Sequence, residues 1–121
     1  MDKLFELTAS NAARLIKEQK ISSTELTRSC LERIDARDQE IHAWQCVDFE
    51  GAMAAAARAD NANHSKGSLH GVPVGLKDII DTAHLPTTYG SKAFANHQPA
   101  RSEEHTSELQ SRSDLVCRLL L

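Results

Sequence analysis

The apolar positions at the start of the chain recur at helical spacing and predict a first short helix. Ala12, Leu15 and Ile16 would share one face, and Thr8 stands before them as the N-cap. A polar stretch at residues 17–20 ends the pattern. Apolar stripes of this kind usually face a core, so packing is the expected role of this helix.

A second helix is predicted to begin at a capping box. The Ser22 hydroxyl can accept a hydrogen bond from the main chain of Glu25, and the Glu25 carboxylate can accept one from Ser22. Leu26, Cys30 and Ile34 then follow at intervals of four residues, so the helix extends to about residues 35–37. Because its link to the first helix is short, the two helices are expected to form an antiparallel hairpin.

The next segments alternate between strand and helix patterns. Residues 41–49 have the period of a strand, and the alanine-rich residues 50–62 predict a helix because no helix breaker follows Gly51. A polar loop at residues 61–67 leads to a short apolar strand at residues 72–77. This order indicates an α/β fold, a helical hairpin followed by strand–helix–strand, and such a crossover favours parallel pairing of the two strands.

The run from Gly67 to Thr82 is the most informative stretch of the chain. One face of its strand is apolar and consists of Val72, Val74 and Leu76. The other face consists of Pro73, Gly75 and Lys77, so it carries small residues and ends in a lysine. The second face has little bulk before Lys77, so another backbone or a ligand could approach closely there. Lys77 is then either a surface charge at a strand end or a buried amine with a shifted pKa.

The same run resembles the lysine segment of the amidase signature family. The matching residues are Leu69-His70-Gly71-Val72-Pro73-Val74-Gly75-Leu76-Lys77-Asp78, followed by Asp81-Thr82, Leu85-Pro86-Thr87-Thr88 and Gly90-Ser91. The family's lysine lies in the context G-[VI]-P-[VI]-x-[VIL]-K-D, and the likeness extends from about Leu7 to about Pro99. The resemblance implies that Lys77 is a catalytic lysine and that the fold is an incomplete piece of the family's mixed-sheet fold.

The family cleaves amide bonds with a Ser–Ser–Lys triad, which defines the chemistry that the resemblance implies. A free lysine has a pKa of about 10.4, so it acts as a base only where burial or nearby positive charge lowers that pKa. In the family the lysine exchanges a proton with a serine beside a cis peptide bond, and that serine activates the nucleophilic serine. Both serines lie in a downstream Gly/Ser-rich run, which does not occur here. The resemblance therefore implies a C–N hydrolase truncated before both serines, and this chain alone is expected to be inactive.

Several functional assignments stay open at this point. The family includes amidases that act on small carboxamides and the glutamine-hydrolysing A subunit of a tRNA-dependent amidotransferase, and the sequence does not separate them. An alternative of another class is a small α/β interaction module without catalysis, in which Lys77 is only structural.

The composition changes sharply from about Arg101 onward. Residues 101–111 read R-S-E-E-H-T-S-E-L-Q-S, which is similar to the translated start of a widely used sequencing adapter and matches nothing in the amidase family. We expect residues 1–100 to be the N-terminal part of an amidase domain and residues 101–121 to be a non-native tail, disordered or incidentally helical. A genuine amphipathic C-terminal helix is the alternative, with one apolar face made of Leu115, Val116, Leu119 and Leu120.

Composition and charge restrict the location and the partners. A chain of 121 residues with 40% apolar and 26% charged residues is typical of one soluble globular domain. A net charge of −3 gives no basic surface for nucleic acid or a membrane, and no apolar run could span a bilayer. No signal peptide is visible, and three widely spaced cysteines fit a reduced, cytoplasmic protein. The expected partner of the full-length protein is a small-molecule amide substrate.

No metal and no cofactor are expected. Asp78 and Asp81 follow Lys77 closely, but no third ligand has a suitable spacing, so solvation or loop hydrogen bonding is the better interpretation. The histidines form no H-x-x-x-H pattern, and His70 is expected to be structural. The glycines match neither G-x-G-x-x-G nor a P-loop. Residues 87–91 could line a substrate pocket or form a turn, so the substrate-binding residues stay unassigned.

Overall fold

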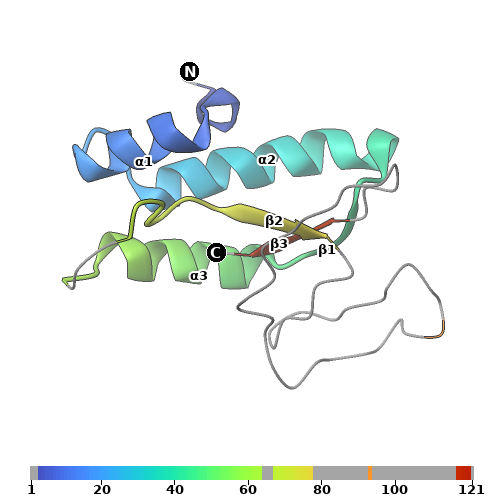
Figure 1. The fold of residues 1–121 in the computed structure, drawn as a ribbon. Helices are drawn as coiled ribbons and strands as arrows, with labels where there is room; N and C mark the ends of the chain where they lie inside the picture. The colour runs from blue at the N-terminus through green and yellow to red at the C-terminus, as the bar shows by residue number, and fades with distance from the viewer. Residues whose placement is uncertain (1–2, 64–66, 78–92, 94–116, 121) are drawn as a thin grey trace.

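The computed structural model describes residues 3–63, 67–77, 93 and 117–120 of the chain. Helices and strands are mixed in these residues, as the sequence predicted. The elements in order are η1 (Leu4–Glu6), α1 (Ala9–Lys17), α2 (Ser23–Ile41), β1 (Trp44–Val47), α3 (Phe49–Asp60), β2 (Val74–Lys77) and β3 (Cys117–Leu120). Figure 1 shows α1 and α2 running in opposite directions, which confirms the predicted helical hairpin. None of the helices in this described part is long and apolar enough to cross a membrane.

Both predicted helix starts are confirmed by their hydrogen bonds. The Thr8 hydroxyl accepts a bond of 3.2 Å from the main-chain N–H of Asn11 at the start of α1. At the start of α2, the Ser22 hydroxyl accepts from the Glu25 N–H at 3.0 Å, and the Glu25 carboxylate accepts from the Ser22 N–H at 2.8 Å. These bonds use main-chain donors that a helix leaves without partners in its first turn.

Helix α2 is longer than predicted, because its end is set by polar bonds rather than by an apolar stripe. It continues to Ile41, and His42 closes it in the left-handed conformation with φ 55°. The Asp38 carboxylate accepts hydrogen bonds from the N–H groups of Ala43 at 2.7 Å and Trp44 at 3.2 Å. The strand that was predicted at residues 41–49 is therefore shortened to β1, since Ile41 belongs to α2, His42 closes that helix and Phe49 begins α3.

Small side chains let α2 and α3 pack closely. The fully buried residues Ser23 and Thr27 lie on α2, and Ala52 and Ala56 are buried on α3. Short side chains at facing positions allow two helix axes to approach. Beside this contact, Leu31 and Ala52 form the centre of the core; the side chains packed around them are Ile34, Trp44, Val47 and Met53.

The sheet in the described residues has the order β1-β3-β2, which differs from the predicted pairing. Strand β3 is parallel to β1 and antiparallel to β2, so β1 and β2 are neither neighbours nor parallel. The prediction of a parallel pair was wrong because it assumed that α3 returns against the sheet. Figure 1 shows α3 and β2 running in opposite directions, so α3 continues in the direction of β1 and β2 makes the return. Residues 117–120 are a strand here and not part of an incidental helix.

Candidate functional site

Lys77 lies at the carboxyl end of β2 and is partly buried. Its Cα is paired with Cys117 of β3, and Cys117 is paired on its other side with Trp44 of β1. The three positions thus form one row across the sheet, in which Trp44 and Lys77 are separated by about 10 Å, or two strand spacings. Other predicted positions lie outside the described residues: Asp78, Asp81, Thr87, Thr88, Gly90 and Ser91.

The bare face of β2 is approached by an aromatic ring. A Cβ atom added to Gly75 would lie 2.9 Å from Cη2 and 3.4 Å from Cζ3 of Trp44. The predicted close approach is therefore confirmed, but the group that makes it is a side chain of this chain and not a backbone or ligand. Lys77 shares this face, because strand residues two apart point to the same side. On the opposite face Val74 is 43% exposed, whereas Leu76 is partly buried.

The start of the lysine segment is bound to the first turn of α2. The buried Ser23 hydroxyl donates a hydrogen bond of 2.6 Å to the main-chain oxygen of Gly71. Gly71 has φ +80°, and a Cβ atom there would lie 3.0 Å from the Cβ of Ser23. A glycine suits this position for both reasons, since other residues resist positive φ and would crowd Ser23.

Asp60, in the last turn of α3, joins that helix to the same turn of α2. Its carboxylate accepts hydrogen bonds from the N–H of Ser23 at 2.6 Å, the N–H of Thr24 at 3.0 Å and the Thr24 hydroxyl at 2.6 Å. Burial alone would raise the pKa of Asp60, but these bonds, with the nearby His70, outweigh burial and lower the pKa. An ionised carboxylate is also favourable beside the N-terminus of α2.

His70 completes this connection, which we call the segment anchor: Ser23, Thr24, Asp60, His70 and Gly71. A ring nitrogen of His70 lies 2.8 Å from the main-chain oxygen of Ala59, next to Asp60. The structural role predicted for His70 agrees with this contact. The anchor holds the chain just before β2 against the ends of α2 and α3, and thereby fixes where the strand that carries Lys77 begins.

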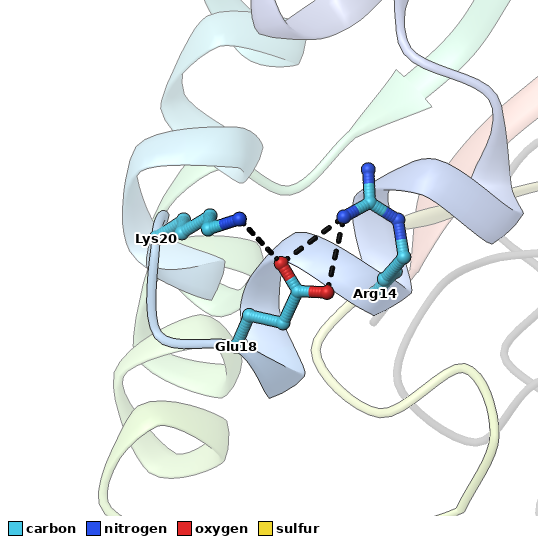
Figure 2. Close-up of polar contacts among 3 residues, drawn as sticks. All are labelled: Arg14, Glu18 and Lys20. Atoms are coloured by element: carbon cyan, nitrogen blue, oxygen red, sulfur yellow. Dashed lines mark hydrogen bonds and ion pairs between the residues drawn. The ribbon is translucent and has the colours of Figure 1, made fainter.

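A polar groove adjoins the anchor. It has a volume of about 470 Å³ and is lined by Ile16, Gln19, Lys20, Ile21, Ser22, Glu25, Ala59 and Asp60. Figure 2 shows how the turn beside it is held: Glu18 accepts from Lys20 at 2.8 Å and from Arg14 at 3.0 and 3.1 Å. Hydrogen bonding from Lys20, and then from Arg14, lowers the pKa of Glu18. The Glu18 carboxylate thus pairs with two cations at this turn.

The described residues include no group of three His, Cys, Asp or Glu side chains that could hold a metal ion. His42 closes α2, and His70 belongs to the anchor. Burial raises the pKa of the Cys30 thiol, which disfavours the reactive thiolate form.

The sequence did not predict the groups that hold the lysine segment. Ser23, Asp60 and Trp44 were expected only to belong to their helices and strand. Two signals were nevertheless available, the single tryptophan of the chain and the bare strand face that ends in Lys77. Which side chain fills such a face depends on tertiary structure, and periodicity does not contain that information.

Comparison with known proteins assigns the family. The family model named Amidase matches residues 25–115, so this chain belongs to the amidase family. The A subunit of glutamyl-tRNA(Gln) amidotransferase from Salinispora tropica is 40% identical over 102 residues, which are 82% of this chain and 21% of that protein. The putative amidase AmiD of Mycobacterium bovis is 33% identical over 118 residues, 95% of this chain and 25% of that protein.

The matches cover most of this chain but only a small part of each relative. The A subunit from Mycolicibacterium vanbaalenii, 41% identical over 100 residues, is also matched over 76% of this chain but only 20% of its own length. The chain thus spans a fifth to a quarter of the length of these curated relatives. No solved structure matches the chain significantly.

Proposed function

We propose that this chain carries the lysine part of an amide-hydrolysing site, with Lys77 as the base of a Ser–cis-Ser–Lys proton relay. The observation that supports this most is the place of Lys77 in the family's lysine motif, at the end of a strand whose bare face it shares. The location that we propose is the cytoplasm, on the basis of the cysteine content.

In the proposed reaction, the neutral Lys77 amine would take a proton from the bridging serine, which takes one from the nucleophilic serine. The serine oxygen then bonds to the amide carbon, the C–N bond breaks, and the amine leaves with a proton. Water releases the acyl group as a carboxylic acid. Both serines would come from the longer family chain.

A chimera tests this role directly. Residues 1–100 would replace the corresponding part of a full-length amidase relative, and hydrolysis of a small carboxamide would be measured. Lys77→Met is expected to lower kcat by roughly 10²–10⁴-fold, the usual contribution of a positioned base. Lys17→Met, on the exposed end of α1, is the matched control and should leave kcat unchanged. An unchanged rate in Lys77→Met would overturn the proposal.

The 121-residue chain by itself is expected to be inactive, because the acyl-enzyme route needs a nucleophile that the motif does not supply. The purified chain would be incubated with small carboxamides and with glutamine, and ammonia release compared with buffer. Turnover that is lost on treatment with a serine-directed inhibitor would contradict this expectation.

A second candidate substrate is the side-chain amide of glutamine. It is favoured by the higher identity to relatives named as amidotransferase A subunits, 40% and 41% against 33% for the putative amidase. The same chimera, built in both kinds of relative, separates the two. Ammonia release from glutamine that depends on Lys77 in the amidotransferase chimera, without carboxamide hydrolysis in the other, would favour the A subunit.

A further inference from the structure

We infer that Trp44 is a positioning residue for Lys77, and this inference rests on the proposed function of that lysine. Two independent observations place the indole on the lysine's side of the sheet. Trp44 and Lys77 are both paired with Cys117, from opposite sides, so they belong to one row. The ring also reaches the bare face of Gly75, two residues before Lys77.

The ring is held in this place by the core. Trp44 packs against Leu31 of α2 and Ala52 of α3, the centre of the hydrophobic cluster. The main-chain N–H of Trp44, at the start of β1, donates a hydrogen bond of 3.2 Å to the Asp38 carboxylate. A side chain fixed at its backbone and at its ring forms a rigid wall, in contrast to a loop residue.

The contact at Gly75 depends on the missing side chain. At 2.9 Å from Trp44 Cη2, an added Cβ would force the ring to move, because real Cβ atoms do not approach so closely. Gly75 and Lys77 share a face. The indole therefore occupies the space over the strand before Lys77, and it blocks a path of the lysine side chain back toward Gly75.

The position of the indole limits where the Lys77 amine can lie. With the path over Gly75 closed, the Lys77 side chain is directed to the carboxyl end of β2. That end is where the motif continues, so an amine held there would meet groups supplied by the later parts of a family chain. Trp44 would thus act through Lys77 and would not itself touch a substrate.

Nuclear magnetic resonance on the 121-residue chain tests the contact without any need for activity. Protons near an indole ring are shifted by its ring current, and the chain has a single tryptophan. We expect shifted signals for the Gly75 Hα and the Lys77 methylenes. Both shifts should be lost in Trp44→Leu and retained in part in Trp44→Phe. Lys77 signals that are unshifted in the parent chain, or unchanged in Trp44→Leu, would overturn the inference.

If Trp44→Leu does not fold, the Gly75→Ala variant tests the contact between Trp44 and Lys77 instead. It keeps the tryptophan but displaces the ring, so the Lys77 shifts should change while signals of the segment anchor, such as His70, stay in place. Unchanged Lys77 shifts in a folded Gly75→Ala protein would also overturn the inference.

In the chimera, Trp44→Leu should lower kcat with little change in KM, and Trp44→Phe should restore part of the lost kcat. A chimera that is inactive while the parent chain shows the ring-current shifts would count against the proposed function and not against the contact.

Discussion

At the scale of single residues, a few small side chains and polar atoms decide how the lysine segment is placed. Gly71 and Gly75 both lack a Cβ where one would meet Ser23 or Trp44. Ser23 is completely buried and uses its hydroxyl to bind Gly71. The strand that ends in Lys77 is therefore placed by two glycines, a buried serine and a tryptophan elsewhere in the fold.

Gly71→Ala should lower the free energy of unfolding by roughly 1–2 kcal/mol, the usual cost of a left-handed conformation in a residue other than glycine. The crowding against Ser23 adds to that cost. Gly67→Ala is the matched control, because a Cβ there would meet nothing within 4 Å. Urea denaturation followed by circular dichroism measures both variants. Equal stability of the two variants would show that the Gly71 conformation is not under strain.

Thr27 is the buried polar group whose hydroxyl has no hydrogen-bond partner in the described residues. Thr27→Val keeps the shape and removes an unsatisfied hydroxyl, so it should be neutral or stabilising by up to about 1 kcal/mol. Thr24→Val provides the contrast, since the Thr24 hydroxyl donates to Asp60 at 2.6 Å and its loss should destabilise the protein. The melting temperatures of the two variants test this expectation. A clear loss of stability in Thr27→Val would reveal a hydrogen-bond partner for that hydroxyl.

At the scale of elements, the sequence predicted what local rules control and missed what distant contacts control. The N-caps at Thr8 and Ser22 follow from residues three positions apart, and both were found. The end of α2 depends on one carboxylate, Asp38, that binds the main chain beyond the helix. The start of β2 depends on the anchor at Gly71, whose partner Ser23 lies 48 residues away in the sequence.

Asp60 links α2 to α3, and its ionisation should make that link dependent on pH. Its pKa is lower in the folded protein than in the unfolded chain, where a value of about 3.9 applies. The contribution to stability is therefore complete above about pH 4 and is lost as the pH falls through the folded-state pKa. Glu18 and Glu25 also have lowered pKa values, so the parent chain shows their effects as well.

The Asp60→Asn variant isolates this contribution. At neutral pH the variant should be less stable by about 1 kcal/mol, the typical value of a lost helix cap. The loss is no larger because the carboxylate is exposed and water screens its charge. The difference between parent and variant should shrink as the pH falls from 5 toward 2. Free energies of unfolding at a series of pH values test it. A difference that stays constant over this range would mean that Asp60 acts only through its shape.

At the scale of the whole molecule, the family could be predicted from the sequence, whereas the arrangement of the sheet could not. The motif around Lys77 is a local pattern, and the match to the amidase family agrees with it. Strand order is set by pairing between segments far apart, and β3 comes from residues 117–120. Strand β3 lies between β1 and β2, and it belongs to residues 101–121, which the sequence predicted to be a non-native tail. That prediction can therefore be tested through the fold.

Removal of residues 101–121 tests how far the fold depends on that strand. The contacts of α2 with α3, the core around Leu31 and the segment anchor are all formed within residues 3–77. We therefore expect the shortened chain to keep the helical circular dichroism of the parent. Strands β1 and β2 would lose their shared partner, and unpaired strand edges promote association. Light scattering should accordingly show more self-association than in the parent chain. Loss of the helical signal would mean that these residues stabilise the helical layer, and it would argue against a tail that is foreign to the fold.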